Sequence, residues 1–147
     1  MRQEYFCGLS VRITRGTDGQ GGGQGPVVVL LHGFGAPGED LLPLADVLAV
    51  PHGTRFFFPE GPLNLGFGYG DARAWWLIDM ARIQADREAG RVRDLSQEVP
   101  KGLAPAREKM LAFLKEIEQK FGADPKKTVL GGFSQGAMLS CDLILHT

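Results

Sequence analysis

Residues 128–140, TVLGGFSQGAMLS, decide how the chain is expected to fold. The stretch begins with a β-branched and aliphatic run, continues through glycines and ends in an apolar segment typical of a helix. GFSQG matches G-x-S-x-G, the sharp turn that presents a serine between a strand and a helix. Glycines at 132 and 136 fit this turn, because a side chain at either position would collide with the neighbouring strand or helix. The sequence therefore predicts a strand–turn–helix unit centred on Ser134.

The rest of the chain alternates between strand and helix patterns. PVVVLLH (26–32) and TRFFFPE (54–60) are continuous apolar runs, typical of strands buried on both faces of a parallel sheet. The remaining expectations are a strand over 4–13, a flexible glycine-rich loop over 16–25, helices over 39–50, 77–94 and 105–122, and a pocket or lid segment over 61–76. Strands that alternate with helices predict a single α/β domain with a parallel sheet over residues 1–147.

Parallel strands bring their carboxyl ends to one edge of a sheet. The turns after His32, Pro59 and Phe133 are therefore expected to meet there, where such sheets bind ligands. HGFG, residues 32–35, follows the first buried strand, and its glycines would let the loop turn backbone amides inward. We assign two amide donors for a developing oxyanion to Phe34 and Gln135. The alternative is that HGFG is only a glycine-rich turn.

Four motifs in this order resemble the phospholipase/carboxylesterase group of α/β-hydrolases, which includes bacterial carboxylesterases and acyl-protein thioesterases. They are LLHGFG, FPEGP, RAWW and GGFSQGAMLS, and the resemblance covers residues 27–145. It implies an α/β-hydrolase fold with three layers and a mostly parallel sheet, incomplete at its C-terminal side. It also implies Ser134 as nucleophile, no metal and no organic cofactor. The supporting residues that it implies are His32, Gly33, Gly35, Gly132 and Gly136.

The same resemblance implies that the segment around 65–76 forms a wall of the acyl pocket. Leu65, Phe67 and Trp75 are the candidate substrate-binding residues. Phe67 and Tyr69 are weaker candidates, and the packing or lid role is favoured for both. Because adjacent loop residues face different ways, one ring of the Trp75–Trp76 pair is expected in the core and the other, Trp75, beside the substrate.

The residues that would activate Ser134 are harder to find. The fold supplies its triad in the order serine, acid, histidine, and only thirteen residues follow Ser134. His52 and His146 are expected at the opposite edge of the sheet, and His32 is expected to shape the oxyanion loop. Asp142 is interpreted as a solvated carboxylate. The acid and the base are therefore expected from another segment, and the strand before Ser134 is expected to be an open edge. Self-association or pairing with that segment follows.

Composition narrows the function classes. The chain has 147 residues and a formal net charge of -1, without the basic stripe that binding to nucleic acid requires. No run is long enough for a membrane span, and the N-terminus lacks the pattern of a signal or transit peptide. Cys7 and Cys141 lack metal-ligand spacing and are interpreted as reduced and partly buried. Together these features predict a cytoplasmic protein.

Three functional interpretations stay open at this point. The first is a serine esterase whose substrate is a short or medium acyl ester, a lysophospholipid or an acyl thioester. The second is a non-catalytic hydrolase module that acts as a binding or partner subunit through its open edge. The third is a fragment without a role of its own. The intact serine turn favours the first, and the early end of the chain favours the second.

Overall fold

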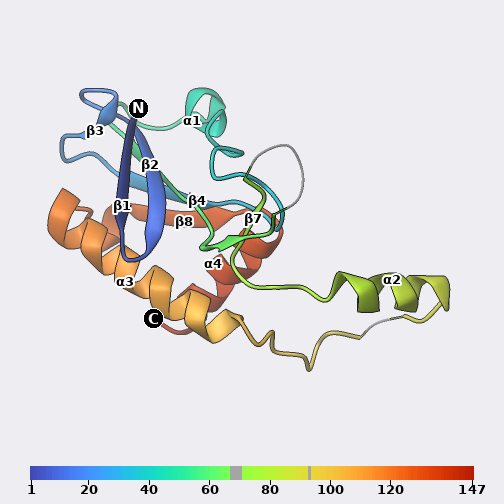
Figure 1. Ribbon diagram of the computed structural model, residues 1–147. Helices are drawn as coiled ribbons and strands as arrows, with labels where there is room; N and C mark the ends of the chain where they lie inside the picture. The colour runs from blue at the N-terminus through green and yellow to red at the C-terminus, as the bar shows by residue number, and fades with distance from the viewer. Residues whose placement is uncertain (67–70, 93) are drawn as a thin grey trace.

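A computed structural model describes residues 1–66, 71–92 and 94–147 (Figure 1). Phe67 and Tyr69 lie outside these residues. The strands are β1 (Arg2–Phe6), β2 (Leu9–Gly16), β3 (Gln20–Gly22), β4 (Val27–Leu31), β5 (Arg55–Pro59), β6 (Leu63–Asn64), β7 (Arg73–Ala74) and β8 (Thr128–Gly132). The helices are α1 (Leu44–Val47), α2 (Met80–Glu88), α3 (Leu103–Phe121), a 3-10 turn (Pro125–Lys127) and α4 (Gln135–Leu145).

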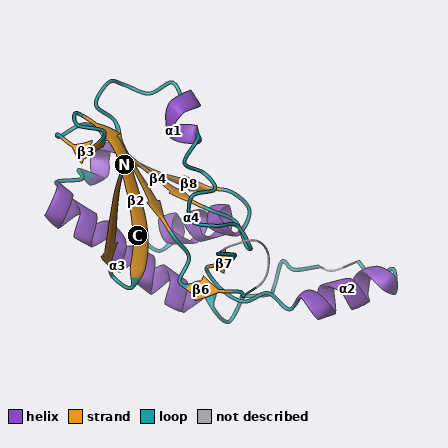
Figure 2. Cartoon of the chain, turned by 45° about the horizontal axis from the view of Figure 1, so that its top comes forward, coloured by secondary structure: helices purple, strands orange, loops and turns teal. Residues whose placement is uncertain are grey.

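The main sheet has the order β1-β2-β5-β4-β8, with β3 paired to β2. β4 is parallel to both β5 and β8, whereas β2 is antiparallel to both β1 and β5. β6 and β7 form a separate two-stranded sheet (Figure 2). The predicted mostly parallel α/β-hydrolase sheet is therefore confirmed for the strands that carry the motifs. The carboxyl ends of β4, β5 and β8 lie at one edge.

The sheet is covered on both faces. On one face its apolar side chains pack with buried residues of α3 and α4, including Met110, Phe113 and Leu139. On the other face Phe56 and Phe58 of β5 pack with Ala45 of α1 and with the chain before it. Consecutive phenylalanines of β5 thus enter opposite layers, as the alternation of side chains along a strand requires. The expected three-layer arrangement is confirmed (Figure 1).

The N-terminal segment differs from its prediction as a single strand over 4–13. Cys7 and Gly8 both have positive φ, of 54° and 71°, and reverse the chain between β1 and β2. Two residues with positive φ form the tight turn that matches the twist of an antiparallel hairpin. The apolar pattern continues across this turn, so the reversal is not visible in hydrophobicity alone.

The glycine-rich stretch also differs from expectation, because residues 20–22 form β3 and pair with the end of β2. The Asp18 carboxylate accepts hydrogen bonds from the backbone N–H groups of Gln20 and Gly22, at 2.8 and 2.9 Å. One side chain thereby supplies the order that glycine lacks.

The three helices predicted over 39–50, 77–94 and 105–122 are present, and the first two are shorter than expected. The first, expected over 39–50, is only the single turn of α1, because Pro43 stands at its N-cap and the chain before it forms turns. α2 occupies half of its expected range and has no buried residue; Ile83 and Asp86, one turn apart, are half-buried, and its other residues are exposed. It projects away from the sheet in Figure 1. The prediction for α3 is confirmed, with Gly122 in the left-handed conformation at its C-terminus.

Arg55 of β5 is an unexpected core residue. Its side chain is fully buried and donates hydrogen bonds to the carbonyl oxygens of Gly25, Phe121 and Gly122. Burial lowers the pKa of this guanidinium from its ordinary value. A buried cation bonded to carbonyls that α3 leaves unpaired at its C-terminus fixes this helix against the sheet.

Candidate active site

Ser134 stands between the end of β8 and the start of α4, where it caps the helix. Its backbone has φ 52° and ψ −116°, a combination that residues with a Cβ rarely adopt. The residue is exposed, and the helix N-terminus behind it holds N–H groups without intrahelical partners. A strained turn thus presents the Ser134 hydroxyl at the edge where β4, β5 and β8 end.

The glycines on either side make this turn possible. A Cβ at Gly132 would lie 2.5 Å from the carbonyl oxygen of Leu31, and a Cβ at Gly136 would lie 2.0 Å from the same atom. Both distances are far below a van der Waals contact. The Phe133 N–H also donates to the Leu31 oxygen at 3.0 Å. The end of β4 therefore passes directly under the serine turn, with no room for side chains between them.

The HGFG loop continues from β4 and lies against Ser134. A Cβ at Gly33 would be 3.3 Å from the Cβ of Ser134 and 3.4 Å from the carbonyl oxygen of Phe133. The loop is tied down beyond this contact, because the Gly35 N–H donates to the Arg73 oxygen at 2.8 Å. Phe34, half-buried, lies between these two contacts. Two segments a hundred residues apart in sequence thus meet at one serine.

His32 is buried and holds the base of this loop through both ring nitrogens. The Gly61 N–H donates to its Nε2 at 2.8 Å, and its Nδ1 is 2.8 Å from the Gly33 oxygen. Because Nε2 accepts, the proton resides on Nδ1 and is donated to Gly33. Burial lowers the pKa of His32 from its ordinary value, which favours this neutral form. His32 has no lone pair left for the proton of Ser134.

Gln135 performs a task that its backbone position did not reveal. Its side chain is buried, accepts a hydrogen bond from the Trp75 N–H and donates one to the Trp76 oxygen, both at 2.9 Å. The Trp75 indole in turn donates to the His32 oxygen at 3.0 Å. The RAWW segment is thereby fastened to both the serine turn and the HGFG loop. The only feature of the sequence that could have indicated this role is that a glutamine directly follows the serine.

A family model described as Phospholipase/Carboxylesterase matches residues 20–147, most of the chain. The chain belongs to this family.

Solved structures agree with this membership at the level of the fold. The crystal structure of esterase PE8 has a TM-score of 0.66 and 26% identity, and covers 92% of this chain and 56% of its own. A carboxylesterase from Mesorhizobium loti has a TM-score of 0.67 at 19% identity, over 98% of this chain and 57% of its own. Acyl-protein thioesterase 2 from Zea mays has 0.50 at 23%, over 90% and 49%. This chain spans about half the length of these structures. Among curated proteins, none matches it.

The residues predicted to form the substrate wall differ in position: Trp75 borders an apolar hollow, and Leu65 does not. Trp75 and Trp76 are both 3% exposed and both belong to the core, so burial does not distinguish a core ring from a ring beside the substrate. Both border an apolar hollow of about 380 Å³, together with Leu63 and Leu77 and with Pro105 and Ala106 of α3. Leu65 is half-buried and its N–H donates to the Ala72 oxygen, but it is not among the described residues that line the hollow.

The other two histidines lie away from Ser134. His52 is exposed, in the segment that precedes β5, at the opposite end of the parallel strands. His146 is the C-cap of α4, and its Nδ1 is 2.8 Å from the backbone carbonyl oxygen of Asp142. At 1.5 Å per residue, the helix separates it from Ser134 by about 18 Å. None of the three histidines is placed to accept the serine proton.

Asp142 was interpreted as a solvated carboxylate, and the structure corrects this. Arg107 of α3 donates two hydrogen bonds to it, at 2.6 and 3.1 Å. These hydrogen bonds hold the pKa of Asp142 below its ordinary value. Asp142 therefore joins α4 to α3.

The two cysteines are free, as predicted, although Cys141 is exposed and not partly buried. In the described part of the chain, no helix is both long and apolar enough to cross a membrane.

Proposed function

We propose that the protein is a serine esterase in which Ser134 is the nucleophile. The Ser134 oxygen attacks the carbonyl carbon of an ester, its proton passes to a base, and the alcohol leaves with a proton from the same base. Water then attacks the acyl-enzyme, which releases the carboxylic acid and restores the serine. The single observation that carries this proposal is the strained backbone of Ser134, with the HGFG loop against it.

The stabilising groups are the backbone N–H groups of Phe34 and Gln135. Gln135 is the first residue of α4, so its N–H has no partner within the helix and lies at the positive end of the helix dipole. Phe34 follows Gly33, which touches the serine. Two such donors would stabilise the negative oxygen of the tetrahedral intermediate more strongly than the ground-state carbonyl. Neither step needs a metal or an organic cofactor.

The base and its acid partner are proposed to come from polypeptide outside these 147 residues. The reason is that none of His32, His52 and His146 is placed to accept the proton of Ser134. If the 147 residues act alone, the amide donors and binding would retain only a residual rate, about 10³ to 10⁴ over water in triads that lack a member.

The test is covalent labelling of the protein at its full natural length with a fluorophosphonate, followed by peptide mapping. We expect one label, on Ser134, and its loss in Ser134→Ala. The matched control is Ser140→Ala in the same helix, which should still label, because Ser140 is buried and its hydroxyl donates to the Gly136 oxygen. An unlabelled Ser134 in folded protein would refute the esterase proposal.

The substrate proposed is a carboxylic ester or thioester with an apolar acyl group. This class is supported by the mostly apolar hollow of about 380 Å³ beside Trp75 and Trp76, a volume that suits a small ligand. Ser134 does not line this hollow, but Gln135, the residue after it, is hydrogen-bonded to both tryptophans. Short acyl esters, lysophospholipids and acylated proteins all carry such a group. A series of p-nitrophenyl esters from two to twelve carbons, followed by matched thioesters, would separate them. A maximum at acetyl would argue against an acyl chain in the hollow.

A second candidate, a non-catalytic partner subunit, is favoured by one observation. β8 pairs only with β4 among the described strands. Val129 of β8 and Phe133, the residue after β8, are 61% and 67% exposed. Met138, Ile144 and Leu145 of α4 are exposed as well. An open strand edge with apolar neighbours favours pairing with another chain or segment. Stable association without labelling of Ser134 would favour this candidate.

A further inference from the structure

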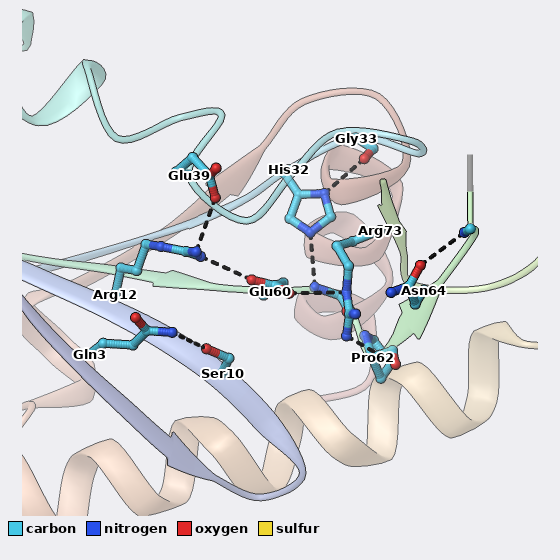
Figure 3. A network of polar contacts seen from close by, with 12 residues as sticks. Gln3, Ser10, Arg12, His32, Gly33, Glu39, Glu60, Pro62, Asn64 and Arg73 are labelled. Carbon is cyan, nitrogen blue, oxygen red and sulfur yellow. Dashed lines mark hydrogen bonds and ion pairs between the residues drawn. The ribbon is translucent and has the colours of Figure 1, made fainter. Parts of the chain in front are cut away.

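Glu60 follows β5 and carries an ion-pair network beneath the HGFG loop (Figure 3). Its Oε2 is 2.9 Å from Nη1 of Arg12 in β2, and its Oε1 is 3.0 Å from Nε of Arg73 in β7. The three side chains are between 11% and 20% exposed. Ion pairs with so little solvent around them are weakly screened, so the loss of one charge disturbs its partners strongly.

This network contacts the loop at three places. The backbone N–H of Gly61, the residue after Glu60, donates to Nε2 of His32 at the start of the loop. Arg73 exchanges two backbone hydrogen bonds with the middle: the Gly35 N–H donates to its oxygen at 2.8 Å, and its own N–H donates to the Ala36 oxygen at 3.1 Å. Arg12 then pairs with Glu39 at the far end, 3.0 Å away.

Gly38 shows how closely the loop lies on the carboxylate. A Cβ at this position would be 2.4 Å from Oε2 of Glu60 and 2.4 Å from Nη1 of Arg12. Gly38 is buried, although the next two residues are exposed. The loop therefore crosses directly over the Glu60–Arg12 pair, and only a residue without a side chain fits there.

We infer that Glu60 is the positioning residue of the oxyanion loop. Its carboxylate holds the Arg73 side chain, which also donates to the carbonyl oxygens of Gly61 and Pro62. The Arg73 backbone in turn positions Gly35 and Ala36, and so directs the Phe34 N–H toward the oxygen that develops on the substrate. This inference rests on the proposed function, since it assigns Glu60 a task only if Phe34 donates to an oxyanion. Glu60 does not touch the substrate and acts through Arg73 and Arg12.

The test compares Glu60→Gln with wild type in two independent measurements on the full-length protein. Glutamine keeps the shape and removes the charge. The first measurement is deuterium exchange of the peptide covering 30–42, which we expect to rise at the Gly35 amide and its neighbours. The second is ester hydrolysis, in which we expect kcat to fall about 10- to 100-fold with KM within twofold, because a misplaced donor weakens only the transition state.

Two further variants keep the inference testable. Asp46→Asn removes a comparable but exposed ion pair with Arg15 of the same strand β2, and should leave exchange and kcat unchanged. Gly38→Ala pushes on the same network from the loop side and should reproduce the Glu60→Gln effects, also if Glu60→Gln fails to fold.

The inference would be overturned by wild-type exchange and kcat in folded Glu60→Gln. It would also be overturned if exchange rose equally along the whole chain, because Glu60 would then support stability in general. If wild-type protein neither hydrolyses esters nor accepts the fluorophosphonate, the proposed function fails, and the exchange measurement alone decides whether Glu60 holds the loop.

Discussion

The two sides of β8 are built on opposite principles. Toward β4, the serine turn and the HGFG loop are joined by buried polar contacts, in which His32 bonds through both ring nitrogens and Gln135 through both its amide oxygen and its amide nitrogen. On its other edge β8 has no further strand beside it in the described chain, and Val129 of β8 and Phe133, which follows β8, are exposed apolar residues. One edge of β8 is thus paired and carries the candidate site, whereas its other edge is unpaired in the described chain.

This difference teaches where substitution should matter. On the β4 side, each polar group has a partner that would be left unsatisfied in a buried place, which costs more than the bond itself gains. On the outer side, a substitution changes only what a solvent-facing surface attracts. Substitutions on the β4 side are therefore expected to have larger effects on stability than substitutions on the outer side.

The largest effect is expected from Gly136→Ala, because its Cβ would lie 2.0 Å from the Leu31 oxygen. The clash is with backbone, so the serine turn and β4 must separate. We expect a loss of about 3 kcal/mol or more in unfolding free energy, measured by urea denaturation. The control is Gly131→Ala in β8, whose Cβ would meet Leu30 at an ordinary 3.6 Å. Equal stability of the two variants would contradict the described packing.

Gln135→Leu should have the next largest effect. The substitution keeps the volume but leaves the Trp75 N–H and the Trp76 oxygen buried without their partner. Each unsatisfied group costs about 1–3 kcal/mol, so we expect a loss of at least about 2 kcal/mol in total by the same denaturation. Gln119→Leu on the exposed face of α3 should change stability by less than about 0.5 kcal/mol. If both variants unfold alike, Gln135 does not clamp the RAWW segment.

A smaller, pH-dependent effect is expected from His32. Its pKa is lowered in the folded protein by burial, so below the ordinary value of about 6.5 the unfolded chain binds the proton first. Stability should therefore fall as pH drops below about 6.5, on the order of 1 kcal/mol per pH unit. His32→Asn should remove much of this slope between pH 7 and 5, and His52→Gln should not. An unchanged slope in His32→Asn would assign the dependence to other groups.

The smallest effect on folding is expected on the outer side. Val129→Lys places a charge at the open edge and should change unfolding free energy by less than about 0.5 kcal/mol. It should nevertheless reduce self-association or partner binding, because an edge lysine opposes strand addition. Size-exclusion chromatography over a range of concentrations checks this. For the 147 residues on their own, a monomer at high concentration before the substitution would contradict the proposed pairing at this edge.

Much of the β4 side, with the serine turn and the HGFG loop, could be predicted from sequence because its signals are local. Glycines around Ser134 and a strand before it fix the turn, and β-branched or aromatic runs fix β4 and β5. The three contacts that hold the loop could not be predicted, since Glu60, Arg73 and Arg12 are far apart in sequence. The β1–β2 reversal was missed because two positive φ values leave no mark on hydrophobicity, and β3 because Asp18 orders glycines through its side chain.

The most direct test is a crystal structure of the protein after reaction with a fluorophosphonate. The account predicts phosphorus bonded to Oγ of Ser134 and one phosphonyl oxygen about 2.7–3.1 Å from the backbone nitrogens of both Phe34 and Gln135. A phosphonyl oxygen that faces solvent, with the nitrogen of Phe34 out of hydrogen-bond range, would contradict it.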